Sequence, residues 1–210
     1  FGVYWHAAVL VAAPFIYPYF IQHIGMSFTQ IAIFTAIAAI TALIAGPQWG
    51  RLADRVGNRS LLQITTFLAG SIIPLAWMLA RPGNPTAIYV SGFLEGLIWS
   101  ALNPAFFNLS LATTPKENRI AYLGVLSFCA GLAGFLGGLA AGPLLFFFKQ
   151  ISFTAYGFEW TGFHWLFLLT ALLRTQAWHF IRRIEETHAW RTRDVVRLVR
   201  HYRLIGFPWR

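Results

Sequence analysis

Residues 46–60 read GPQWGRLADRVGNRS, and this charged stretch stands between two long uncharged ones. Residues 1–50 contain no Asp, Glu, Lys or Arg, and residues 60–80 are again without charge. A short segment that combines turn glycines with fixed cations is typical of a cytoplasmic turn between two membrane helices. We therefore predict that residues 46–60 form a water-facing loop between two membrane spans.

The composition of the 210-residue chain is that of a membrane protein, with 57% hydrophobic and 11% charged residues. Several of its uncharged stretches reach the roughly 20 residues that an α-helix needs to cross the hydrocarbon core of a bilayer. Residues 1–184 are predicted to form the helical bundle, and residues 185–210 a basic cytoplasmic tail. We predict an all-α polytopic fold with six transmembrane helices in two three-helix repeats, spanning about 2–22, 28–45, 61–80, 86–111, 120–148 and 163–181.

The distribution of Lys and Arg predicts the orientation of these spans. Of the 16 basic residues, three lie in 46–60, two in 112–119 and eight after residue 181, whereas two lie on the opposite side. Because basic loops stay in the cytoplasm, we expect the inner loops and the C-terminal tail there. The net charge of +9 follows from this topology. We expect an integral protein of the bacterial inner (plasma) membrane that does not bind nucleic acid.

The charged stretch also has the spacing of a known motif. A glycine is followed by an aspartate four residues later, a basic residue, a second glycine and a basic end, at Gly50, Arg51, Asp54, Arg55, Gly57 and Arg59. This string resembles the loop signature of the major facilitator superfamily. Residues 13–50 resemble the seventh and eighth helices of that family, and residues 103–119 resemble its tenth helix and the following inner loop. The whole chain therefore resembles the C-terminal six-helix half of a twelve-helix major facilitator fold.

The resemblance implies a secondary active transporter that works by alternating access between two six-helix bundles. Its partners would be the lipid bilayer, a small-molecule substrate of unknown identity, and a missing N-terminal six-helix half or a second copy of the chain. The chain begins at Phe1 inside a span and without a methionine, so we expect an N-terminal part to be missing. Proton coupling is left open. The alternative is a non-transporting scaffold or assembly subunit of a larger membrane complex.

Two charged residues, Glu95 and Arg174, lie inside predicted spans. An ionisable group inside a membrane is costly, so it usually faces a cavity or a partner of opposite charge. Glu95 can take up a coupling proton, or it can pair with Arg174, which lies at a similar depth in the sixth span. A guanidinium stays charged and needs an anion or water. We favour the ion pair over the proton role.

Polar side chains in the first and fourth spans are the candidates for lining a substrate path. By resemblance these two spans face the central cavity, and they contain Tyr17, Gln22, Asn103 and Asn108. Pro104 removes one backbone hydrogen bond beside the two asparagines and bends the helix. In the fifth span Gly134, Gly138 and Gly142 are spaced four residues apart. This spacing lets helices approach closely, so we predict that these glycines pack against another helix.

Motifs of enzymes and of nucleotide-driven pumps are missing from the sequence. The histidines form no HExxH pair, and neither a GxSxG elbow nor a GxxxxGK[ST] phosphate loop occurs. We therefore expect that the chain is not an enzyme and that it holds no cofactor and no metal.

Overall fold

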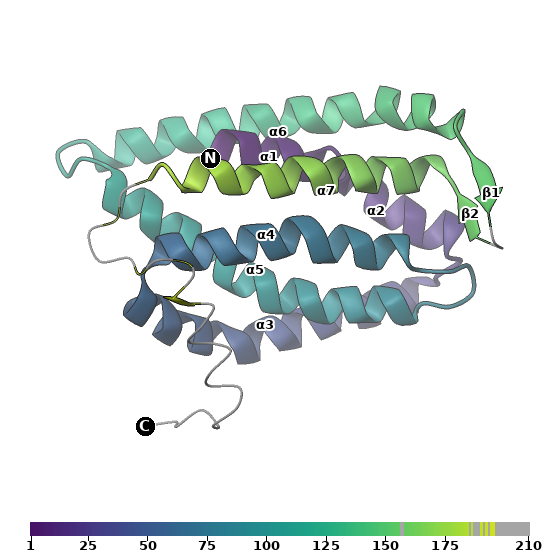
Figure 1. Ribbon diagram of the computed structural model, residues 1–210, viewed down its shortest axis with the longest axis horizontal. Coiled ribbons are helices and arrows are strands. Elements are labelled where there is room, and N and C mark those ends of the chain that lie inside the picture. The colour runs from purple at the N-terminus through teal and green to yellow at the C-terminus, as the bar shows by residue number, and fades with distance from the viewer. Residues whose placement is uncertain (156–157, 185, 187–189, 191, 193, 196–210) are drawn as a thin grey trace.

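The computed structural model describes residues 1–155, 158–184, 186, 190, 192, 194 and 195. Long helices lie side by side, and a short hairpin joins two of them at one end (Figure 1). In chain order the elements are α1 (Gly2–Leu10), α2 (Ala13–Pro18), a π-helical turn η1 (Tyr19–His23), α3 (Phe28–Val56), α4 (Asn58–Met78), α5 (Thr86–Thr113), α6 (Arg119–Lys149), β1 (Phe153–Ala155), β2 (Phe158–Trp160) and α7 (Gly162–Ile181). The predicted all-α fold class is confirmed. The predicted basic tail lies almost entirely outside the described residues.

The first helical segment is broken and not straight. Helix α1 ends at Leu10, and Pro14 stands in the first turn of α2, where a missing backbone N–H costs nothing. Pro18 then precedes η1, in which the Ile24 N–H reaches back five residues to the Tyr19 oxygen at 3.1 Å. The α1–α2 break exposes backbone carbonyl groups that a continuous helix would have used.

The predicted loop at 46–60 is wrong, because most of this stretch is helical. Helix α3 continues to Val56 and α4 begins at Asn58, so Gly57 alone separates the two helices. Gly57 has a φ of 87°, which glycine adopts without the steric cost that other residues meet. With 29 residues α3 is about 43 Å long, well beyond the roughly 30 Å of hydrocarbon. Charged residues on the protruding turns can stay in water without leaving the helix.

The helices pack in four main pairs, and each pair joins one helix of the first predicted repeat to one of the second. The pairs are α1 with α6, α3 with α5, α4 with α7, and α4 with α5. Helix α4 therefore lies between α5 and α7 (Figure 1). We call the end of the bundle at the α3–α4 connection the Gly57 end, and the opposite end the hairpin end.

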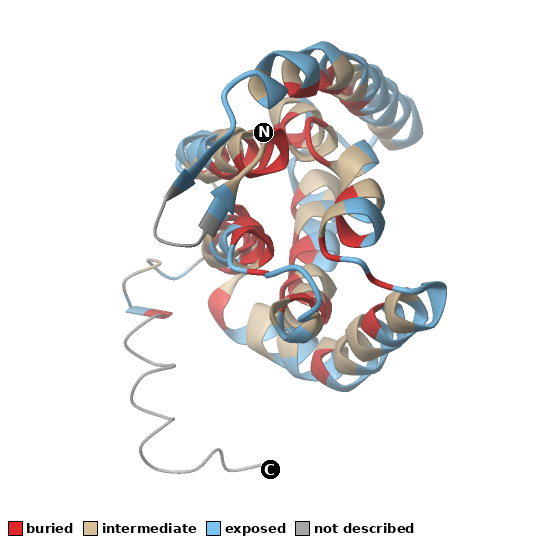
Figure 2. Cartoon of the chain, turned by 90° about the vertical axis from the view of Figure 1, so that its right-hand side faces the viewer, coloured by how far each residue is buried: buried red, intermediate tan, exposed pale blue. Residues whose placement is uncertain are grey.

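Burial differs sharply among the long helices. Twelve of the 21 residues of α4 are buried, compared with five of the 31 residues of α6. Buried residues gather on the facing sides of the helices, while much of α3 and α6 is exposed (Figure 2). Their exposed side chains are largely apolar, as expected for surfaces that meet lipid or another helical domain.

Four helical segments in the described part of the chain are long and apolar enough to cross a membrane. They are Gly2–His23, Phe28–Val56, Asn58–Met78 and Arg119–Lys149. Helices α5 and α7, with 28 and 20 residues, are not among these four. The spans at 86–111 and 163–181 therefore stay predictions.

Glycines set the closest approaches between helices. A methyl group on Gly96 of α5 would collide with the Ala38 backbone oxygen of α3, and one on Gly92 would lie 2.8 Å from the Phe34 ring. On α6 the closest position is Gly137, where a methyl group would lie 2.5 Å from the Ala7 oxygen of α1.

The three glycines singled out in the sequence have looser surroundings. A methyl group on Gly134 would lie 3.4 Å from Leu10, and one on Gly138 would lie 3.8 Å from the Leu10 oxygen. Around Gly142 no atom lies within 4 Å of that position. A packing role for Gly142 therefore stays a prediction, since no other helix among the described residues contacts it at that point.

Candidate functional site

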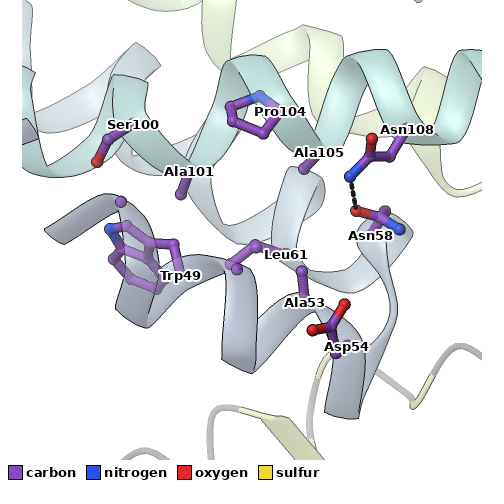
Figure 3. A pocket seen from close by; sticks show the side chains of 12 residues that line it. Trp49, Ala53, Asp54, Asn58, Leu61, Ser100, Ala101, Pro104, Ala105 and Asn108 are labelled. Carbon is purple, nitrogen blue, oxygen red and sulfur yellow. Dashed lines mark hydrogen bonds between the residues drawn. The ribbon is translucent and has the colours of Figure 1, made fainter. Parts of the chain in front are cut away.

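A small cavity of about 90 Å³ lies at the Gly57 end, between α3, α4 and α5 (Figure 3). Its floor is fixed by the Trp49 indole N–H, which donates to the Leu97 oxygen of α5 at 2.8 Å. Asn108 of α5 donates to the Asn58 side-chain oxygen of α4 at 3.4 Å. Pro104 and Ala105 line the α5 side, and the cavity thus joins the charged motif to the part of α5 that contains its proline.

The motif residues surround this cavity and the turn beside it. Gly50 and Asp54 line the cavity from α3, and the Asp54 carboxylate is exposed at its rim (Figure 3). Arg51 and Arg55 are exposed on the same helix end, and Gly57 forms the turn. Asp54 is therefore placed to accept hydrogen bonds from outside the chain.

A carboxylate from beyond α7 caps the first turn of α4. Glu186 accepts the backbone N–H groups of Asn58 at 3.1 Å and Arg59 at 2.7 Å. A negative charge is favourable there, because the unpaired N–H groups of a helix N-terminus carry partial positive charge. Arg59 also donates to the Arg182 backbone oxygen at 2.9 Å. Sequence reasoning missed Glu186, although an acidic residue in a basic segment was a visible signal.

A second cluster forms where α4, α5 and α7 meet. The Trp77 indole N–H of α4 donates to Glu95 of α5 at 3.2 Å, and the Arg174 guanidinium of α7 lies 5.6 Å from the centre of the Trp77 ring. Arg174 is only 1% exposed. A cation over an aromatic face is attracted by the electron-rich ring, more strongly where water is excluded.

The predicted pairing of Glu95 with Arg174 is not seen as a salt bridge in the described residues, although the two charges are close enough to interact electrostatically. Within the described residues the two charged groups do not contact each other, and Trp77 stands between them. The physical reason is the order of the helices, because α4 separates α5 from α7. The sequence correctly indicates that Glu95 and Arg174 lie at a similar depth along the bundle axis. It does not indicate that they lie on different sides of α4.

Arg174 instead binds the broken first helix. Its guanidinium donates to the Val9 backbone oxygen at 3.3 Å, and the neighbouring Thr170 hydroxyl donates to the Ala8 oxygen at 2.6 Å. Both carbonyl groups belong to the last turn of α1, which lacks the donors of a continuing helix. Helix α7 thus supplies the hydrogen bonds that the α1–α2 break leaves open.

The four predicted cavity-lining residues are not brought together. Asn108 reaches the cavity at the Gly57 end, whereas Asn103 is exposed one turn earlier on α5. Tyr17 is 49% exposed on α2, and Gln22 is exposed in η1. Among the described residues no His, Cys, Asp or Glu side chains gather in a way that suits a metal ion.

Fold and site together define a polytopic α-helical membrane protein whose helices carry few charges within the bundle and several at the Gly57 end. Comparison with known families then identifies the family to which it belongs. The chain belongs to the Major Facilitator Superfamily, whose family model matches residues 6–206. The predicted family is thereby confirmed, as is the prediction that the chain belongs to a family of membrane transporters and not of enzymes.

Relatives in several organisms have similar sequences. The chain is 28% identical over 132 residues to solute carrier family 67 member A1 of Homo sapiens, covering 62% of this chain and 31% of that protein. It is 28% identical over 143 residues to the multi-drug resistance efflux pump PmrA of Streptococcus pneumoniae, with 66% and 33% covered. It is 28% identical over 113 residues to the class E tetracycline resistance protein of Escherichia coli, with 54% and 26% covered. The chain thus spans about a third of the length of these relatives.

Proposed function

We propose that this chain forms the C-terminal six-helix half of a secondary transporter that moves a small solute by alternating access. Membership of the family supports this proposal, and so do relatives that are named as efflux pumps and solute carriers. The second wall of the transport path then comes from an N-terminal six-helix half or from a second copy of the chain. The substrate path runs along the exposed faces of α1 and α5.

The observation that carries the proposal is the position of Asp54. Its exposed carboxylate stands at the rim of the cavity between α3, α4 and α5, beside the single-residue turn. A carboxylate can accept hydrogen bonds from the N-terminus of a facing helix, and the positive end of that helix strengthens them. Such a contact from the other half closes the cytoplasmic side of the transporter, and breaking it opens that side.

Accessibility of the Gly57 end in the complete protein tests this role without a known substrate. Cys129 is replaced by serine, and a single cysteine is introduced by Asn108→Cys at the cavity. Asp54→Asn should speed labelling of that cysteine by a bulky maleimide, because the closing contact is lost. Glu117→Gln, which neutralises an exposed carboxylate in the neighbouring turn, is the matched control. Equal labelling rates in the Asp54 variant and its parent would overturn the closing role.

The orientation is part of the proposal. We place the Gly57 end, which carries most of the described arginines, in the cytoplasm and the hairpin end outside. An Asn118→Cys variant should react only with reagents that enter the cell, and an Asn84→Cys variant should react with reagents that do not. Labelling of Asn118→Cys from outside intact cells would reverse the orientation.

Proton coupling is a finer candidate that rests on Glu95 alone. Its carboxylate is half-buried in α5 and accepts a hydrogen bond from an uncharged donor, the Trp77 indole. If Glu95 takes up the coupling proton, Glu95→Gln abolishes accumulation driven by a pH gradient and preserves protein levels and passive exchange. If the complete protein accumulates no solute under any gradient, the scaffold alternative replaces transport.

A further inference from the structure

A groove of about 380 Å³ runs between α4 and α7, away from the cavity at the α3–α4 connection. Ile64, Phe67 and Leu68 of α4 form one wall, and Trp178 of α7 forms the other. The two polar residues that line it, Gln63 and Thr192, are hydrogen-bonded to each other through their side chains. The groove therefore offers a largely apolar surface, in which the Gln63 side-chain oxygen already accepts the Thr192 hydroxyl.

The groove begins near the Gly57 end, between different helices from the cavity there, and extends along α4 toward the hairpin end. Ile64 lies six residues into α4, about 9 Å from the start of the helix, and Trp178 lies three residues before the end of α7. Ile64, Leu68 and Leu75 fall on one face of α4 at helical spacing. Leu75 is 48% exposed. The apolar track therefore continues for two further turns, a length that suits an extended hydrocarbon chain.

Arginines gather where the groove reaches the Gly57 end. The Arg182 guanidinium lies 5.0 Å from the centre of the Trp178 ring, and Arg183 beside it is exposed. Arg59 joins this corner through its hydrogen bond to the Arg182 backbone oxygen. One acidic residue at the corner, Glu186, already accepts two backbone N–H groups of α4. The corner thus keeps an excess of positive charge next to an apolar track.

We infer that the α4–α7 groove binds an anionic phospholipid of the cytoplasmic leaflet. One acyl chain lies along Ile64, Leu68 and Leu75, and the phosphate lies against Arg182, Arg183 and Arg59. Guanidinium groups suit phosphate because their N–H donors match two of its oxygens at once. Basic corners at the cytoplasmic ends of membrane helices attract acidic lipids electrostatically. A lipid fits better than a substrate, because the groove does not lie on the transport path. That path is assigned to α1 and α5, whereas the groove lies between α4, which packs against α5, and α7, which packs against α1.

Lipid titration of the complete purified protein tests this site. The protein is stripped of lipid in detergent and titrated with phosphatidylglycerol or with phosphatidylcholine of the same acyl chains, and bound lipid is counted by native mass spectrometry. Phosphatidylglycerol should bind more tightly, and Arg182→Gln with Arg183→Gln should weaken it by about fivefold for each arginine removed. Lys116→Gln with Arg119→Gln removes the same charge at the start of α6 and should leave the affinity unchanged.

A substitution that fills the groove tests the contribution of the apolar track to lipid binding separately from that of the arginines. Ile64→Trp should weaken binding of both lipids, whereas Val125→Trp on the exposed face of α6 should not. Equal retention of the two lipids by the unmodified protein, or equal losses in the two tryptophan variants, overturns the inference. The placement in the cytoplasmic leaflet depends on the orientation proposed above, but binding in detergent does not. A failure here therefore leaves the transport proposal untouched.

Photocrosslinking tests the same site in the unmodified protein and therefore does not depend on whether a variant folds. Phosphatidylglycerol with a photoreactive group in one acyl chain is bound to the unmodified protein and irradiated. Crosslinked peptides should contain residues 64–68 or Trp178. Crosslinks that fall only on α3 or α6 show that the lipid covers the exposed bundle surface without a site, and the inference is then wrong.

Discussion

The α3–α5 contact and the α4–α7 contact hold the same bundle by different physical means. Between α3 and α5 the backbones approach closely because Gly92 and Gly96 have no side chains. Between α4 and α7 a glycine, Gly70, also allows close approach, but the buried Arg174 fills the space beside it. Arg174 and Thr170 extend the α4–α7 contact to α1, and Trp77 extends it to α5. Steric fit thus joins two helices, whereas the polar cluster joins four.

The largest effect is expected from Gly96→Val, which breaks the steric contact. The first carbon of the new side chain meets the Ala38 backbone oxygen, so α3 and α5 must move apart. Overpacking of this kind costs about 3 kcal/mol. The free energy of unfolding, measured by denaturation in detergent, should fall by that amount. Gly131→Val is the matched control because no atom lies near that position, and an equal loss there would show that the cost is one of helix propensity.

A smaller loss is expected from Trp77→Phe in the polar cluster. The substitution keeps a ring beside Arg174 and removes the indole N–H that Glu95 accepts at 3.2 Å. A half-buried carboxylate that loses such a donor costs about 2 kcal/mol. Trp99→Phe, which removes an indole N–H without a hydrogen-bonded partner in the described chain, is the control.

A double-mutant cycle in the same cluster decides how Glu95 is connected. Trp77→Phe and Glu95→Gln should be strongly non-additive, because both remove the same hydrogen bond. Glu95→Gln and Arg174→Met should be closer to additive, since Trp77 separates the two charges. A larger coupling for the second pair would restore the direct ion pair in solution and contradict the arrangement described above.

Thr170→Val tests the tie to α1 and should cost about 1 kcal/mol. Valine has the same shape but leaves the Ala8 oxygen, now bonded at 2.6 Å, without its donor. Thr175→Val is the comparison, because the Thr175 hydroxyl bonds only to carbonyl groups of its own helix. Thermal unfolding in detergent should separate the two variants, and identical midpoints would mean that α7 does not hold α1 through this hydroxyl.

The smallest effect is expected from Gly142→Ala. Nothing lies within 4 Å of the added methyl group, so stability should change by less than about 0.5 kcal/mol. A clear loss in the complete protein, with none in this chain alone, would assign Gly142 to a contact with the other half. That result would also rescue the packing role predicted from spacing.

Much of the fold could be predicted from the sequence because the bilayer imposes simple rules. Long apolar stretches with at most one charged residue each located all six helical segments, and the motif at Gly50–Arg59 identified the family. Lateral arrangement could not be predicted, because depth and spacing do not say which helices are neighbours. Glu95 and Arg174 were therefore paired across α4. Gly92 and Gly96 have the same four-residue spacing as the glycines that were chosen, and only the packed structure shows that theirs is the closer contact.

The site was predicted in part for a related reason. Charges and glycines at 46–60 were taken as signs of a loop, although Arg, Leu and Ala are good helix formers and a helix end in water tolerates charge. Glu186 stands out as an acidic residue in a basic segment, but nothing in the sequence indicates that it and Arg174 bind backbone groups. Backbone donors and acceptors exist along the whole chain. Among the described residues, the break in α1 leaves carbonyl acceptors free for Arg174, and the start of α4 leaves N–H donors free for Glu186.

The one-residue connection at Gly57 has a mechanical consequence. A loop of several residues would absorb a displacement of one helix before the next one felt it. Helices of 29 and 21 residues joined by a single residue have no such slack, so a tilt at the protruding end of α3 is passed directly to α4. Helix α4 packs against both α5 and α7. A displacement of the exposed end of α3 is therefore transmitted through α4 to the middle of the bundle.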